Sequence, residues 1–195
     1  MSPDDHRWPL LNLLADYLQR HPSESDMVQR YQDFVSENTD CFERSLLTGH
    51  VTGSALVLDS NRQRVLLTHH RNLNKWLQPG GHADGDSDVM NVGLREALEE
   101  TGLVVVKPIT DELLDVDIHL IPAHRDGSEH FHYDCRFLLG SGGSDTFTVS
   151  AESYDLAWVS MDRITDYTTD ESILRMIEKA HELTRKIGKL GSVPI

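Results

Sequence analysis

The segment Gly81–Leu103 constrains the fold and chemistry of this chain more than any other part of it. Glu96, Glu99 and Glu100 stand at positions i, i+3 and i+4 of a predicted helix that Gly102 ends, so their carboxylates share one face. Like charges at this spacing repel by about 0.2–0.5 kcal/mol per pair, and the helix dipole disfavours anions in the last turn. A hard divalent cation would reverse that balance, because Mg²⁺ and Mn²⁺ prefer carboxylate oxygens.

The loop before this helix supports a metal site. Glutamate-rich helix ends are common and usually solvated, so three glutamates alone do not define one. The run Pro79-Gly80-Gly81, however, lets the backbone approach a ligand closely, and its carbonyl groups can serve as metal ligands. Loop and helix together therefore predict a divalent-metal site.

The same segment resembles the box of the Nudix family. The box reads Gly, five residues, Glu, seven residues and Arg-Glu-hydrophobic-X-Glu-Glu-X-Gly-hydrophobic, and here Gly81 and Arg95–Leu103 have this spacing. Every fixed position matches except Ser87, which stands where the pattern has Glu. By element order the resemblance extends from about residue 48 to 185.

The resemblance implies a bound Mg²⁺ or Mn²⁺ and assigns its ligands. Glu96, Glu99 and Glu100 match the metal-binding glutamates of the box, and the Gly80 carbonyl matches a further ligand. The ion would neutralise substrate charge, orient a diphosphate and lower the pKa of water.

The resemblance also implies catalytic residues. Arg95 matches the arginine that orients the box carboxylates, and Glu152 is the best match to a later loop carboxylate that completes the site or acts as base. Glu100 and Glu152 both remain candidates for the general base. The residues expected to be catalytic are Arg95, Glu99, Glu100 and Glu152.

Ser87 is the one departure from the box, and it raises the question of what pairs with Arg95. Asp84, Asp86 or Asp88 could replace the missing glutamate as the ionic partner. Alternatively, Ser87 caps the helix, for which serine is a favoured residue. We expect altered activity to be possible, but no loss of the metal site.

Hydrophobic spacing predicts an α/β fold. Helical periodicity covers most of residues 4–46, whereas residues 76–82 contain strong breakers and are interpreted as a loop. This order predicts a Nudix-type α/β/α sandwich with a mixed β-sheet, in which 1–46 is an N-terminal helical extension and 47–195 is the Nudix hydrolase domain. The extension either covers one side of the domain or forms a dimer contact. Strands are expected near 51–58, 65–68, 113–121, 130–139 and 156–159, and helices near 88–100 and 171–186.

The stretch His130–Phe137 alternates cleanly between apolar and polar residues. Its polar face either lines the active-site cleft or is a solvated sheet face. A zinc site here is not favoured, because neither a cysteine nor a further histidine follows at ligand spacing. The candidate substrate contacts are His82, His130, His132 and Arg136.

Composition limits the possible partners and location. The formal net charge of −14 argues against a long nucleic acid, since binding its backbone requires a basic surface. Neither a membrane span nor a secretory signal is expected. Cys41 and Cys135 are far apart in the sequence, which favours two reduced thiols in the core of a cytoplasmic protein. A homodimer is a separate expectation, linked to the N-terminal helices.

These observations predict a metal-dependent hydrolase that cleaves a diphosphate linkage in a nucleoside diphosphate-linked or similar small molecule, by water attack on phosphorus. One alternative is a non-catalytic module that senses a nucleotide, and another is a structural interaction protein, for which the glutamates have no use. A third is an enzyme like isopentenyl diphosphate isomerase, which would require a cysteine–glutamate pair in the pocket. The substrate itself is not predicted.

Overall fold

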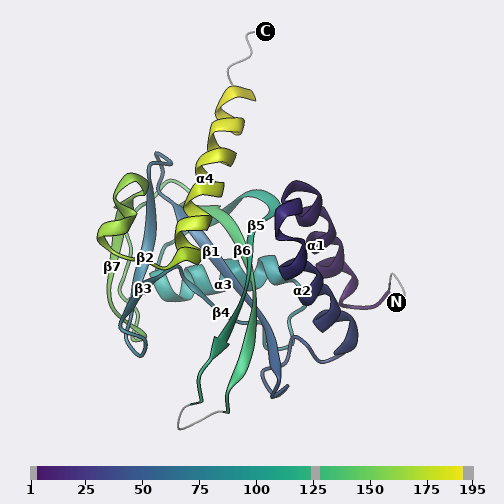
Figure 1. Ribbon diagram of the computed structural model, residues 1–195. Coiled ribbons are helices and arrows are strands. Elements are labelled where there is room, and N and C mark those ends of the chain that lie inside the picture. Colours follow the sequence, from purple (N-terminus) through teal and green to yellow (C-terminus); the bar gives the residue numbers. More distant parts are fainter. Residues whose placement is uncertain (1–3, 124–127, 191–195) are drawn as a thin grey trace.

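The computed structural model describes residues 4–123 and 128–190, and in this part of the chain a seven-stranded mixed sheet lies between helices (Figure 1). The strand order is β3-β2-β1-β6-β5, with β4 paired to β1 and β7 paired to β2. β1 and β6 run parallel, whereas the other pairs are antiparallel. The strands are β1 (Gly49–Leu58), β2 (Arg64–His70), β3 (Lys75–Leu77), β4 (Gly80–His82), β5 (Lys107–Ile121), β6 (His130–Gly140) and β7 (Ser153–Ser160).

Helices cover both faces of the sheet and enclose a separate apolar core on each side. On one face, α1 (Trp8–Arg20), α2 (Ser25–Glu37) and α3 (Val89–Thr101) pack on residues such as Ala55 and Phe137. On the other face, α4 (Glu171–Leu190) packs on a second cluster that includes Leu56. The predicted α/β/α sandwich is therefore confirmed.

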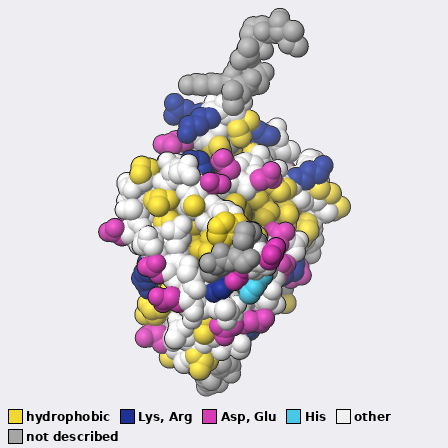
Figure 2. Space-filling model, turned by 90° about the vertical axis from the view of Figure 1, so that its right-hand side faces the viewer, with side chains coloured by type: hydrophobic (Ala, Val, Ile, Leu, Met, Phe, Trp, Pro, Cys, Tyr) yellow, Lys and Arg dark blue, Asp and Glu magenta, His cyan; other side chains and the backbone are white. Residues whose placement is uncertain are grey.

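The N-terminal helices pack directly against the sheet. Tyr31 of α2 is fully buried, and its hydroxyl donates to the Tyr133 carbonyl at 2.7 Å. Arg20 at the end of α1 donates to the Leu113 carbonyl at 3.1 Å. Of the two roles expected for the N-terminal extension, the structure shows α1 and α2 covering one side of the sheet. On this face, acidic side chains are spread among basic and hydrophobic ones (Figure 2).

The region expected to be a loop, residues 76–82, differs from the prediction. It contributes β3 and β4, strands of three residues each that pair with β2 and β1. Strands this short have no recognisable alternation, and the Pro-Gly-Gly run favoured a loop. The structure also adds two 3₁₀ helices, η1 (Pro22–Glu24) and η2 (Met161–Asp166).

Two helix ends coincide with local end signals in the sequence, whereas the helical stretch predicted over residues 4–46 ends earlier, at Glu37. α1 ends at Arg20, immediately before His21-Pro22, and α3 ends at Gly102, which has φ 63°. Residues 38–46 contain turns rather than helix. Within the described ranges, no helix combines the length and apolar character needed to cross a bilayer.

Candidate active site

A cleft of about 670 Å³ opens where β1, β4 and α3 meet. Its wall includes the four acidic residues singled out in the sequence, three from α3 and one from the loop before β7. The backbone of Gly80 and Gly81 forms part of the same wall. These four are Glu96, Glu99, Glu100 and Glu152, and the wall also contains Asp84, Asp86 and Asp134.

The packing of α3 on β4 brings the carboxylates against the glycine backbone. Glu100 is only 6% exposed, and its Oε1 accepts a hydrogen bond from the Gly80 amide at 3.2 Å. A Cβ placed on Gly81 would lie 2.5 Å from the carboxylate carbon of Glu96, so only glycine leaves this space free. The two glycines thus permit the close approach that the sequence predicted.

Arg95 holds Glu96 in place. Its Nη2 donates to Oε1 of Glu96 at 3.0 Å and to the His82 carbonyl at 2.7 Å. The guanidinium therefore links the helix to the end of β4. This geometry agrees with the orienting role expected for Arg95.

None of the three aspartates near Ser87 pairs with Arg95. Asp84 forms an ion pair with Arg44, and Asp86 accepts a hydrogen bond from the side chain of Asn91 at 2.8 Å. Asp88 is the helix cap, because its Oδ1 accepts from the Asn91 amide at 3.1 Å. Two predictions are therefore wrong: no aspartate pairs with Arg95, and Ser87 does not cap the helix. Arg95 donates hydrogen bonds to the His82 carbonyl and to Glu96, and the capping residue is Asp88.

The carboxylates are in an environment that disfavours negative charge. Burial, together with the charges of Glu96 and Glu152, raises the pKa of Glu100 to about 8, although the hydrogen bond from the Gly80 amide opposes the shift. Burial also raises the pKa of Glu96, although Arg95 opposes this. Clustered and partly desolvated carboxylate oxygens are a suitable donor set for Mg²⁺ or Mn²⁺, which would offset their mutual repulsion. The residues present therefore fit the ion that the box implies.

The four predicted substrate contacts do not all reach the cleft. His82 and His132 line it, whereas His130 does not form part of its wall. Arg136 is 2% exposed, and it is paired with Asp134 at 2.8 Å and with Asp115 at 3.1 Å. Arg136 lies outside the cleft wall, and its guanidinium is already paired with these buried carboxylates. The prediction that Arg136 contacts the substrate is therefore wrong, and the residue belongs to a structural ion pair.

Other cleft residues were not singled out from the sequence. Arg44, from the turn before β1, and Gln78, between β3 and β4, belong to the wall. His119 reaches it from β5. No local pattern marks these residues, since each reaches the cleft through contacts distant in sequence.

The two cysteines lie outside the cleft wall. Both are buried free thiols, as predicted, and Cys135 contacts the hydroxyl of Tyr31 at 3.0 Å in the core. An isomerase-type site with a cysteine in the pocket is therefore not favoured.

Comparison with known proteins agrees with this architecture. The model of the NUDIX domain matches residues 49–179, which is more than half of the chain. The chain therefore belongs to the Nudix family, and the resemblance found in its sequence is confirmed. The N-terminal helices α1 and α2 lie outside the matched range.

Curated relatives match only part of the chain. The m7GpppN-mRNA hydrolase NUDT17 of Danio rerio is 40% identical over 73 residues, which are 35% of this chain and 24% of the relative. The nucleoside diphosphate-linked moiety X motif 6 protein of Xenopus laevis is 40% identical over 58 residues, 29% of this chain and 27% of the relative. The match thus spans about a quarter of the length of each relative.

Solved structures share the fold over a longer stretch. The Nudix hydrolase RenU from M. smegmatis has a TM-score of 0.54 and 19% identity, covering 71% of this chain and 88% of that one. The MutT protein from Methanosarcina mazei has a TM-score of 0.52 and 18% identity, covering 71% and 97%. At these identities the likeness demonstrates the fold.

Proposed function

We propose that this protein is a divalent-metal-dependent hydrolase that cleaves a diphosphate linkage in a nucleoside diphosphate-linked or similar small molecule. The observation that carries the proposal is the convergence of Glu96, Glu99 and Glu100 with the Gly80-Gly81 backbone and Glu152 on one cleft. A purely structural role would not require clustered carboxylates in a partly buried position, since burying charge without a partner is unfavourable.

The metal site would consist of the Gly80 carbonyl, Glu96, Glu99 and Glu100. When bound there, Mg²⁺ or Mn²⁺ would neutralise charge on the diphosphate, orient it and lower the pKa of water. Arg95 is the positioning residue, because its contacts hold Glu96 toward Gly81.

The reaction transfers a phosphoryl group to water. The water oxygen forms a bond to phosphorus, the bridging P–O bond breaks, and the phosphate-bearing leaving group takes that electron pair. A carboxylate accepts the proton from water, and both Glu152 and Glu100 remain candidates for this base. Glu152 is exposed on the cleft wall, so it can exchange the proton with solvent, whereas Glu100 is buried with a raised pKa.

The substrate is best sought among small diphosphates. His82, His132 and Arg44 line the cleft and can donate hydrogen bonds to phosphate or base oxygens. The name of the NUDT17 relatives makes a methylated cap dinucleotide a reasonable member of the test panel, alongside ADP-ribose, dinucleoside polyphosphates, nucleotide sugars, coenzyme A and nucleoside triphosphates.

The test is product release from this panel by the full chain with Mg²⁺ or Mn²⁺. We expect turnover that requires the metal and falls about 100-fold or more in Glu99→Gln and in Glu100→Gln, because loss of a ligand costs several kcal/mol of charge stabilisation. Glu112→Gln, an exposed glutamate on β5, is the matched control and should retain wild-type activity.

Each other outcome has a definite meaning. Turnover that survives both box substitutions would show that the site is assigned wrongly. If the panel shifts the melting temperature but nothing is hydrolysed, the protein senses nucleotides and Ser87 is the first position to restore to glutamate. A cytoplasmic location and a homodimer are further proposals, to be tested by fractionation and by light scattering.

A further inference from the structure

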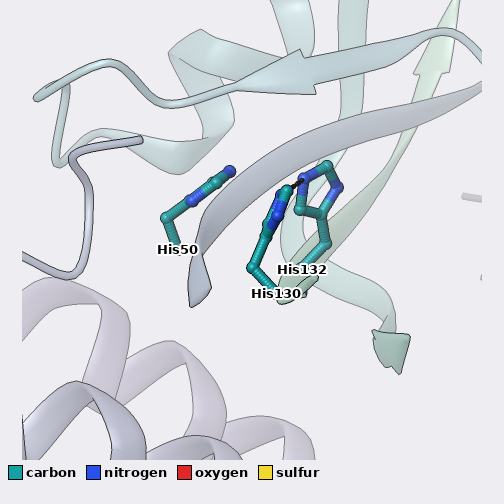
Figure 3. A group of neighbouring side chains, drawn as sticks. All are labelled: His50, His130 and His132. Carbon is teal, nitrogen blue, oxygen red and sulfur yellow. Dashed lines mark hydrogen bonds between the residues drawn. The ribbon is translucent and has the colours of Figure 1, made fainter. Parts of the chain in front are cut away.

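Histidine rings from four strands gather at one end of the cleft wall. The ring of His50 on β1 lies 4.9 Å from the ring of His130 and 4.9 Å from that of His132, both on β6. The two β6 rings are 5.1 Å apart (Figure 3). His82 and His119 lie at the edge of the group, 5.1 Å and 5.4 Å from His132.

The sheet fixes this arrangement. In the parallel β1–β6 pair, His50 stands opposite His132, and His130 is two residues earlier on the same face of β6. His119 of β5 stands opposite His132 on the other side. A site built on paired strands is held more rigidly than one built on loops.

His50 lacks the hydrogen bonds that a buried imidazole normally has. It is only 3% exposed, and neither ring nitrogen makes a hydrogen bond of standard geometry within the described part of the chain, although the backbone of Leu46 lies close enough to raise the pKa of the ring. Such unpartnered buried groups are rare, since desolvation without a partner is unfavourable. A ligand that accepts a nitrogen lone pair would satisfy the ring.

The nitrogens are spaced for one ion. One nitrogen from each of His50, His130 and His132 lies within 4.8 Å of the others, and Nε2 of His130 is 3.3 Å from Nε2 of His132. Two nitrogens that bind the same tetrahedral Zn²⁺ at about 2.0–2.1 Å are separated by about 3.3 Å. The His130–His132 pair thus has the required spacing, whereas the nitrogen of His50, within 4.8 Å of the pair, would have to move closer for all three to bind one ion.

A further contact orients one ligand. Nδ1 of His130 lies 2.8 Å from the Ser128 carbonyl, which can only accept, so Nδ1 carries the proton. The Nε2 lone pair of His130 then accepts a hydrogen bond from Nε2 of His132 at 3.3 Å, which a bound metal ion would replace. Metal-binding histidines commonly have such a carbonyl or carboxylate partner.

Two rings of the cluster, His50 and His132, are held in the neutral form. Burial, followed by the neighbouring rings His82 and His130, lowers the pKa of His50 to about 4. Burial and the surrounding histidines lower the pKa of His132 to about 2. Both rings are neutral at pH 7, and neutral imidazole is the form that binds metals.

We propose that His50, His130 and His132 bind a transition-metal ion of the Zn²⁺ class through ligands distinct from the carboxylates of α3, with His132 in the wall of the same cleft. Nitrogen ligands select Zn²⁺, Co²⁺ or Ni²⁺, whereas the box carboxylates suit Mg²⁺ and Mn²⁺. The sequence did not favour zinc at His130–Phe137, because the third histidine comes from β1, about 80 residues away. The fourth coordination position is open to water.

The first experiment is metal titration of the full chain after treatment with a chelator, in excess Mg²⁺ so that the carboxylates are occupied. Co²⁺ should bind with one equivalent and give the intense visible absorption of tetrahedral coordination, and Zn²⁺ should displace it. We expect affinity for Zn²⁺ to fall about 100-fold or more in His50→Gln and in His132→Gln. His69→Gln is the matched control, because that ring stacks on Trp76 outside the cluster, and Glu99→Gln tests the carboxylate site.

The wild-type protein supplies an independent readout. In long-range ¹H–¹⁵N spectra, Zn²⁺ should shift the imidazole nitrogens of His50, His130 and His132 and leave those of His69 unchanged. This measurement decides the question even if a variant fails to fold. The proposal is overturned if the wild type binds no Zn²⁺, if binding is lost in Glu99→Gln and kept in His50→Gln, or if Zn²⁺ binds without shifting these three rings.

Discussion

Gly81 shows how a single residue without a side chain shapes the candidate active site. A Cβ at this position would collide with the Glu96 carboxylate. Arg95 donates a hydrogen bond to the same carboxylate and so limits its movement. Glycine is therefore required at position 81 by the space that a metal-binding carboxylate occupies, and its backbone conformation is ordinary.

Gly81→Ala should impair the metal site and leave the fold nearly intact. The added methyl group displaces the flexible end of Glu96, so we expect Mg²⁺ affinity and turnover to fall about tenfold or more, as for other groups that orient metal ligands. Calorimetric titration and initial rates measure this. Gly140→Ala is the control, because its Cβ would make only ordinary contacts of 3.7 Å with Ile109. Unchanged Mg²⁺ binding in Gly81→Ala would contradict the assignment of Glu96 as a ligand.

The sequence revealed those site residues whose neighbours are local. Glu96, Glu99 and Glu100 were identified from helical spacing together with the preceding Pro79-Gly80-Gly81 loop and the box pattern, and the structure brings them into one cleft. His50 could not be recognised, because its relation to His132 depends on the parallel β1–β6 register. Arg136 was misjudged for the same reason, since its partner Asp115 belongs to the neighbouring strand.

At the scale of elements, α3 carries the glutamates of the proposed metal site, and its first turn depends on one cap. Asp88→Ala removes the acceptor for the Asn91 amide and should destabilise the protein by about 1 kcal/mol. Ser87→Ala should have almost no effect on stability, because the cap lies at the next residue. Urea unfolding followed by circular dichroism measures both variants. Equal losses in the two would show that Ser87 shares the capping role.

Long, periodic elements were predicted well, whereas elements formed by pairing alone were not. α1, α3 and β6 have strong local signals of period and end residues. β3 and β4 exist because β2 and β1 supply their hydrogen-bond partners, which no local pattern contains. The first half of β5 was missed because its polar residues interrupt the alternation, and its pairing with β6 shifts register there.

At the scale of the whole molecule, Asp115 connects the N-terminal helices, the sheet and α4. This carboxylate, on β5, is fully buried and pairs with Arg136 of β6 at 3.1 Å. Arg175 and Lys179 of α4 contact it as well, and the Tyr17 hydroxyl of α1 lies at 3.2 Å. Burial raises its pKa, but these cations outweigh burial and hold the pKa below its ordinary value.

Asp115→Ala should therefore destabilise the entire protein. Removing one member of a buried ionic network leaves the other charges without compensation, which costs about 3 kcal/mol or more. We expect unfolding to remain a single transition in urea, with tryptophan fluorescence and circular dichroism coinciding, because all three parts lose the same anchor. Asp111→Ala, an exposed aspartate on the same strand, should change stability little. Separate transitions would mean that α1 and α2 unfold independently.

The buried histidines make a different prediction, a loss of stability in mild acid. The pKa of His50 is about 4 in the folded protein against 6.5 for the free side chain. Below pH 6.5 the unfolded chain therefore binds a proton that the folded protein excludes, so stability falls as the pH decreases toward 4. From pH 7 to pH 5, His50 alone should remove about 2 kcal/mol from the free energy of unfolding. Urea unfolding with a chelator present should show a shallower pH dependence in His50→Gln than in wild type or His69→Gln. An identical dependence in all three would mean that water reaches His50 and that its burial is not maintained in solution.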